Sequence, residues 1–223
     1  MNPSSTTHPR WLFDRTGFPY LPVPQVGIAV GVLPITKAQA ELHLADPAGP
    51  GDDWYAEVID IGPRMGWRVP GPCVPWHLLL TGISVEEASR FAAWVGPGYR
   101  LPDLREWRAA DRALSALGPA QLDQLADRID GGDGHPAAAG IIHKLRESGR
   151  RTAAALTLVD GGVLEWVTRP YLKRGGLGRP APDLPGNLIL DPQSFPPVER
   201  LRPGRHPAFG ARLVRPLSPG DTR

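Results

Sequence analysis

The side chains that could hold a metal or carry redox chemistry are few and widely spaced. The chain of 223 residues contains one cysteine, Cys73, which excludes an internal disulfide and a cluster of thiolate ligands. Its histidines show no H-x-x-x-H or H-x-E-H spacing, and a site built from three distant histidines stays open. The six are His8, His43, His77, His135, His143 and His206. We expect His43 and His77 to be packing or surface residues rather than ligands.

Arginine supplies most of the positive charge and could contact phosphate groups. Only three of the 25 basic residues are lysine, and the arginine fork matches carboxylates and phosphates. The basic residues cluster at 146–151 and at 169–179. Because 23 acidic residues leave a net charge of only +2, solvated faces are favoured over a nucleic-acid surface. No phosphate-binding, dinucleotide or serine-hydrolase fingerprint is present.

The segment 81–114 carries the strongest structural signals, which predict two short helices. Ser84 and Glu87 have capping-box spacing, and so do Asp103 and Glu106. A Gly-Pro-Gly stretch separates the two helices. The apolar positions at helical spacing are Ala88, Phe91, Ala92 and Val95 in the first helix, and Leu104, Trp107, Ala110 and Leu114 in the second.

Weaker patterns place the remaining elements. Thr36 and Gln39 form another capping box, and it predicts a helix whose buried side holds Ala38, Leu42 and Ala45. Strands are expected at 26–33 and 54–61, and a strand, turn and strand at 155–168. Helices are expected at 117–129 and 141–151, with loops at 46–53 and 130–140.

Several of these residues carry a resemblance to a known family. The run from Ile83 to Trp107 resembles a segment of the formylglycine-generating enzyme (sulfatase-modifying factor) family. The matching residues are Ser84, Glu86, Glu87, Ala88, Trp94, Arg100, Leu101, Pro102, Glu106 and Trp107. Gly161, Val163, Glu165 and Trp166 match the family's W-E-W signature. Residues 173–176 resemble its R-G-G motif, and residues 209–215 resemble its closing strand.

The resemblance implies a fold. It implies a single α+β domain over residues 23–217, a variant of the C-type lectin fold with two central helices around a twisted antiparallel sheet and much coil. The high content of Gly (26) and Pro (27) agrees with that coil. Residues 1–22 interleave aromatic residues with Pro and Gly, so we expect an irregular N-terminal arm that lies on the domain or on a partner.

The resemblance also implies which chemistry the chain lacks. The family's two copper-binding cysteines correspond to Pro180 and Pro185 here, so we expect no such oxidase activity and no cofactor. The iron-dependent sulfoxide synthases of the family take histidines partly from an additional helical domain, and we expect no such domain here. A metal-dependent oxidoreductase with relocated ligands remains an alternative. Because Leu158 replaces an acidic or amide calcium ligand, we expect Glu165 to pair with an Arg or backbone amides instead.

The function favoured by these observations is a non-catalytic recognition module that binds a partner protein, within a bacterial multi-component defence or signalling assembly. The expected partner-binding residues are Tyr171, Arg174 and Arg179, from a long Pro-rich stretch, together with Trp11 and Phe13 of the arm. An Arg-rich accessory protein that binds nucleic acid is the third alternative. We expect no membrane contact and a cytoplasmic location, because the sequence shows neither a signal-peptide pattern nor a run of about 18 apolar residues.

Overall fold

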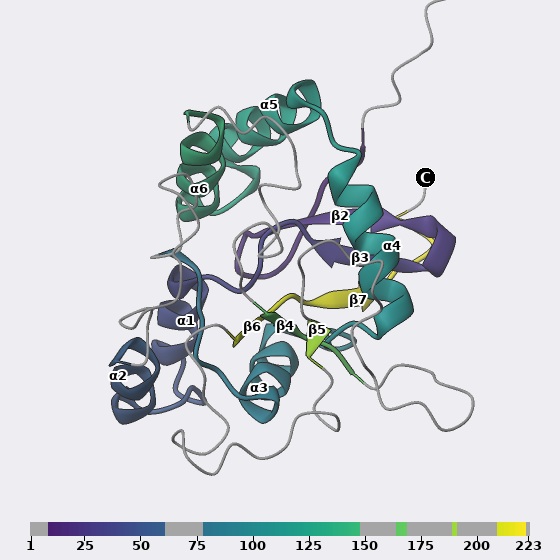
Figure 1. The fold of residues 1–223 in the computed structure, drawn as a ribbon. Coiled ribbons are helices and arrows are strands. Elements are labelled where there is room, and N and C mark those ends of the chain that lie inside the picture. Colours follow the sequence, from purple (N-terminus) through teal and green to yellow (C-terminus); the bar gives the residue numbers. More distant parts are fainter. Residues whose placement is uncertain (1–8, 61–77, 148–163, 169–188, 191–208, 222–223) are drawn as a thin grey trace, which may run out of the picture.

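The computed structural model describes residues 9–60, 78–147, 164–168, 189–190 and 209–221 (Figure 1). The α-helices of these ranges are α1 (Lys37–Leu44), α2 (Asp52–Asp60), α3 (Val85–Val95), α4 (Leu104–Ser115), α5 (Pro119–Arg128) and α6 (Pro136–Glu147), and a 3-10 turn covers Pro24–Val26. The strands are β1 (Leu12–Phe13), β2 (Pro19–Val23), β3 (Ile28–Gly31), β4 (Leu164–Trp166), β5 (Ile189–Leu190), β6 (Phe209–Ala211) and β7 (Val214–Pro216). The predicted α+β class is confirmed. No helix in these ranges is long and apolar enough to cross a bilayer.

The central sheet is antiparallel, with the strand order β1-β2-β3-β7. A tight turn joins β1 to β2, and the Asp14 carboxylate stabilises it. Its Oδ1 accepts hydrogen bonds from the backbone N–H groups of Thr16 at 2.8 Å and Phe18 at 3.0 Å. Gly17 has a φ of 75°, a left-handed conformation that favours glycine. The Asp and Gly of this segment are therefore turn residues of a hairpin.

This hairpin corrects the prediction of an irregular arm over residues 1–22. Residues 12–13 and 19–23 are strands of the central sheet, and residues 1–8 lie outside the described part of the chain. The aromatic side chains of the segment face inward: Trp11 is 2% exposed, and Phe18 and Tyr20 are also buried. The prediction failed because short strands joined by a tight turn leave too few residues for a clear alternation of apolar and polar positions.

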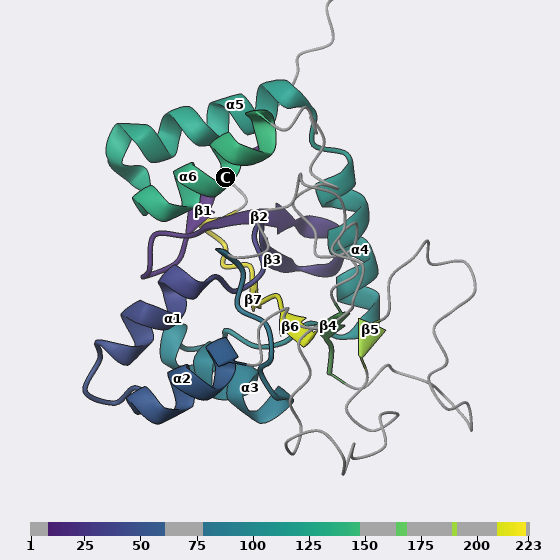
Figure 2. The same ribbon diagram turned by 60° about the vertical axis from the view of Figure 1, so that its left-hand side comes forward.

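The two faces of the central sheet bury two separate hydrophobic cores. Alternate residues of a strand point to opposite faces, and the cores follow this period. Leu21 and Val30, which are paired in register, belong with α4, α5 and α6, whereas Ala29 and Tyr20 belong with α1, α2 and α3. In Figure 2, α5 and α6 lie above β2 and β3, and α1, α2 and α3 lie below them.

A second, three-stranded sheet lies beside the α3 core, in the order β5-β4-β6 with parallel pairing. The closing strand expected at 209–215 is in fact two strands in two different sheets. Between them, Arg212 and Leu213 carry the chain from β6 to β7, and Arg212 is buried. Of the strand, turn and strand expected at 155–168, β4 is confirmed and residues 155–163 lie outside the described ranges.

Three capping boxes predicted from the sequence are confirmed. In each, the side chain of the cap residue accepts a hydrogen bond from the third helical N–H, and the side chain of that third residue accepts one from the backbone N–H of the cap. The pairs are Thr36–Gln39, Ser84–Glu87 and Asp103–Glu106. The apolar face predicted for α3 is buried, as are Trp107, Ala110 and Leu114 of α4. Sequence reasoning succeeded here because capping is local.

Two other segments differ from their predictions. Residues 54–61 were expected to form a strand, but α2 covers Asp52–Asp60. Asp52 and Asp53 occupy its first turn, where their negative charge interacts favourably with the helix dipole. The buried Val58 lies one turn beyond Trp54, on the same side of the helix. The loop expected at 130–140 is replaced by a π-helical turn, Ile129–Asp133, and the start of α6.

The buried side of α1 was predicted only in part: Ala38 is half-buried against the core, but Leu42 and Ala45 are exposed. Gln39, Ala40 and His43 are buried, whereas Leu42 is 37% exposed. Polar contacts explain the difference: the Gln39 side chain donates hydrogen bonds to Asp14 Oδ2 at 3.4 Å and Thr16 Oγ1 at 3.2 Å. This buried hydrogen-bond network stabilises an orientation of α1 that differs from the one that hydrophobicity alone predicts.

Candidate binding pocket

The residues predicted to bind a partner are only partly described by the structure. Tyr171, Arg174 and Arg179 lie outside the described ranges, so their role stays a prediction. The prediction for Trp11 is wrong: its side chain is 2% exposed and lies in the core with α5 and α6, so it does not form a contact surface. Phe13 is half-buried, and the Arg128 guanidinium lies 5.3 Å from the centre of its ring.

Glu165 and Arg212 form a buried ion pair, which confirms the predicted pairing of Glu165 with an arginine. The two side chains are 1% and 2% exposed, with Arg212 Nη2 and Glu165 Oε1 3.2 Å apart. Glu165 Oε2 also accepts a hydrogen bond from the indole N–H of Trp107 at 2.8 Å. Arg212 Nη1 donates to the carbonyl oxygens of Gly31 and Val32 at 2.6 and 2.7 Å. The pair thus ties α4, β3 and β4 together.

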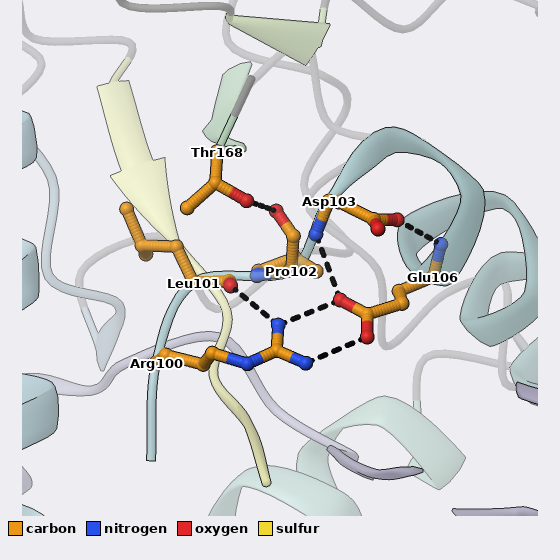
Figure 3. A network of polar contacts seen from close by, with 6 residues as sticks. All are labelled: Arg100, Leu101, Pro102, Asp103, Glu106 and Thr168. Carbon is orange, nitrogen blue, oxygen red and sulfur yellow. Dashed lines mark hydrogen bonds and ion pairs between the residues drawn. The ribbon is translucent and has the colours of Figure 1, made fainter. Parts of the chain in front are cut away.

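A second network fixes the start of α4 (Figure 3). Arg100 Nη1 and Nη2 donate to the two carboxylate oxygens of Glu106, each at 2.7 Å. Glu106 Oε2 also accepts the Asp103 N–H at 2.9 Å, and the Asp103 carboxylate accepts the Glu106 N–H. The Thr168 hydroxyl and N–H both donate to the Pro102 carbonyl. These acidic and basic side chains stabilise the helix start and the adjacent strand end.

The three described histidines lie in different surroundings. His43 is on α1, His135 precedes α6 and stacks on Phe18, and His143 on α6 lies 3.0 Å from Asp130 Oδ2. His8, His77 and His206 are outside the described ranges. Within those ranges, no three His, Cys, Asp or Glu side chains are grouped so that they could hold a metal ion.

The described residues form a pocket of about 560 Å³ between α1, α2 and α3. These helices lie together on one side of the molecule in Figures 1 and 2. The lining is mostly apolar, with Leu80 and Ile83 from the segment before α3. Its aromatic rings belong to His43, Trp54, Phe91 and Trp94, and its charged groups to Glu87 and Arg90.

Carboxylates hold both tryptophans of the pocket in place. The Trp54 indole N–H donates to Glu87 Oε1 at 2.7 Å, and the Trp94 indole N–H donates to Asp46 Oδ2 at 2.9 Å. Hydrogen bonds from the Ala48 N–H and from Trp94 lower the pKa of Asp46. The Arg15 guanidinium lies 4.2 Å from the centre of a Trp94 ring. The two indoles are therefore fixed before any ligand arrives, which limits the entropy lost on binding.

His43 is a neutral aromatic wall of the pocket. Its ring stacks on Trp94 with a centroid distance of 4.5 Å and contacts Phe91 edge-on at 5.4 Å. Burial lowers its pKa, and Asp46 opposes this effect only in part. His43 Nδ1 is buried and has no hydrogen-bond partner among the described residues. The sequence prediction that His43 is a packing residue is confirmed.

The lowered pKa of His43 makes stability depend on pH. An unfolded histidine has a pKa of about 6.5, so the unfolded chain binds a proton at a pH where folded His43 does not. This stability is therefore present above about pH 6.5 and is lost as pH falls through the lower pKa of the folded state. We expect wild type to lose more free energy of unfolding than His43→Phe between pH 7.5 and 5.5, in urea melts at both values. Equal losses would contradict this.

Sequence reasoning did not find the pocket. Its lining comes from a helix, from the loop expected at 46–53, from α2, which was expected to be a strand, and from α3. No local pattern identifies it, because the carboxylates that bind Trp54 and Trp94 lie 33 and 48 residues away in the sequence.

Comparisons with known proteins give no neighbour: no family model, no curated protein and no solved structure matches the chain.

Proposed function

We propose that this protein is a non-catalytic recognition module, and that its pocket receives an anchor side chain of a partner protein. The observation that carries the proposal is a mostly apolar pocket of about 560 Å³ whose two tryptophans are held by carboxylates. This volume lies within the range of roughly 300–1,000 Å³ found for binding pockets. Rigid aromatic walls are typical of sites where one buried side chain supplies much of the binding energy.

The chemistry of the lining supports binding rather than catalysis. The described lining residues offer no hydroxyl or thiol nucleophile. The Glu87 carboxylate accepts the Ser84 N–H at 2.8 Å and the Trp54 indole N–H, so it serves the helix cap and the pocket wall. His43 has its Nδ1 buried inside an aromatic stack, away from solvent. These groups hold the pocket in shape.

The family resemblance is part of the proposal. We propose a formylglycine-generating-enzyme-like domain with the C-type lectin fold, acting within a bacterial multi-component assembly. Contacts between separate motifs support it, because the motif residues bind one another. Trp107 donates to Glu165, and Glu165 pairs with Arg212. The Trp166 indole N–H donates to the Ile83 carbonyl at 2.8 Å. Three distant stretches that resemble the family therefore form one connected structure.

The test begins with a partner isolated from the native host on the tagged protein, then produced in pure form. We expect calorimetry to show direct binding to wild type. Ala93→Trp, at an exposed position in the pocket lining, should weaken binding at least tenfold by filling the pocket. Ala120→Trp, an exposed alanine on α5, is the matched control and should bind as wild type does.

The Pro-rich segment enters the same experiment through a triple alanine variant at Tyr171, Arg174 and Arg179. If this segment adds to the surface, the triple variant also binds more weakly and melts as wild type does. Failure of every purified candidate to bind wild type would contradict the recognition function. Undiminished binding by Ala93→Trp would remove the pocket from it.

A further inference from the structure

We infer that the pocket selects an uncharged aromatic side chain of the partner, tryptophan above all, over aliphatic and cationic side chains. The inference rests on the proposed recognition function and names the group that the site accepts. The balance of charge around the pocket and the arrangement of its rings carry the inference, and they are independent of each other.

The charged side chains that the described residues place in the pocket lining and in the adjoining ion pair are balanced in sign. Glu87 and Arg90 line it with opposite signs, and Arg15 lies 3.6 Å from Asp46 in the adjoining ion pair. His43 adds no charge near neutral pH, because burial lowers its pKa. An entering guanidinium or ammonium would lose water without meeting an excess of negative charge, which is unfavourable in a mostly apolar site. An uncharged ligand loses much less.

The Trp94 ring already has a cation over it and the His43 ring stacked on it. Arg15 lies over this ring, 4.2 Å from its centre, while Asp46 holds both the guanidinium and the indole N–H. A cationic ligand would compete with Arg15 for the same ring, whereas an aromatic ligand can use the remaining walls. Arg15 therefore disfavours the binding of an arginine side chain from a partner.

The pocket is lined by aromatic side chains that already pack on one another, and an entering ring would extend this cluster. His43, Phe91 and Trp94 form one cluster, with centroid distances of 4.5, 5.3 and 5.4 Å and both stacked and edge-on contacts. Trp54 lines the same pocket from α2. Aromatic pairs at such distances gain stability beyond the area that they bury, while an aliphatic side chain gains only the area. The volume of about 560 Å³ leaves room for a bicyclic indole.

The experiment titrates wild type with three amides: N-acetyl-tryptophanamide, N-acetyl-leucinamide and N-acetyl-argininamide. The readout is the indole N–H NMR signals of Trp54 and Trp94, assigned through Trp54→Phe and Trp94→Phe. We expect the tryptophan amide to shift both signals with a dissociation constant of about 1 mM. It should bind roughly two- to tenfold more tightly than the leucine amide. The arginine amide should leave both signals in place.

Two filling variants make the result specific. Ala93→Trp and Ala48→Trp, both at exposed lining positions, should abolish the shifts, and Ala120→Trp should retain them. Two exposed sites are used so that loss of fold in one variant, seen in a melt, does not remove the test. Binding of the arginine amide as tight as that of the tryptophan amide, or no shift with any amide, overturns the inference.

The amide titration needs no partner, so its failure is distinct from failure of the recognition function. If the amides behave as expected and no purified partner binds, the ring selectivity stands alone. The aromatic ring that occupies the pocket could belong to a partner protein or to a small compound, and native mass spectrometry of the purified protein distinguishes the two. A bound small aromatic compound that the tryptophan amide displaces would overturn the assignment to a protein side chain.

Discussion

Arg212→Met is expected to lower the free energy of unfolding by about 3–5 kcal/mol, the largest loss that we expect from one polar substitution here. It leaves the Glu165 carboxylate, 1% exposed, without its countercharge. It also removes the donor that satisfies the carbonyl oxygens of Gly31 and Val32. Urea denaturation at pH 7, followed by tryptophan fluorescence, measures the loss.

The matched control is Arg100→Met, which breaks a bidentate pair whose arginine side chain is 44% exposed. Exposed pairs contribute about 0–1 kcal/mol, so this variant should lose far less. The double variant Glu165→Leu/Arg212→Met should recover part of the stability, because no unpaired buried charge remains. A loss for Arg212→Met no greater than that for Arg100→Met would show that the buried pair does not hold the sheets together.

Trp107→Ala is expected to cost about 3–5 kcal/mol, as truncations of buried aromatic residues do. Trp107 is 3% exposed, and its indole N–H donates to Glu165. Trp107→Phe separates the two contributions: it keeps a ring but removes the indole donor to Glu165 Oε2, which retains Arg212 Nε at 3.2 Å, and it should cost about 1–3 kcal/mol.

Trp94→Ala is the control for the tryptophan truncation, since Trp94 is only half-buried at the pocket and should cost less than Trp107. The measurement is again a urea melt, with the midpoint and slope compared between variants. A loss below about 1 kcal/mol for Trp107→Ala would mean that the inner face of α4 is not part of the core.

The sequence predicted those features that depend on residues close together in the chain. The capping boxes of α1, α3 and α4 each involve a residue and its third neighbour, and all three were found. The buried face of α3 follows from spacing alone, and it too was predicted. The pairing of Glu165 with an arginine was expected on chemical grounds. Its partner, Arg212, is 47 residues away, and nothing local identifies it.

The failures occur where tertiary contacts overrule a local pattern. The pattern at 54–61 favoured a strand, but Val58 is buried once α2 lies against α3. Hydrophobicity alone placed Leu42 inside, but the Gln39 contacts with Asp14 and Thr16 turn α1 the other way. The pocket was not predicted for the same reason: its walls lie on elements that meet only in the folded chain.

The order β1-β2-β3-β7 has a consequence for the chain as it leaves the ribosome. Synthesis makes β2 and β3 early, and this hairpin can close at once. The other edge of β3 pairs with Val214–Pro216, and the carbonyl oxygens of Gly31 and Val32 receive Arg212. While some 180 residues are being added, that edge has no native partner, and an unpaired strand edge is the surface through which nascent chains associate wrongly. Only β7 closes it.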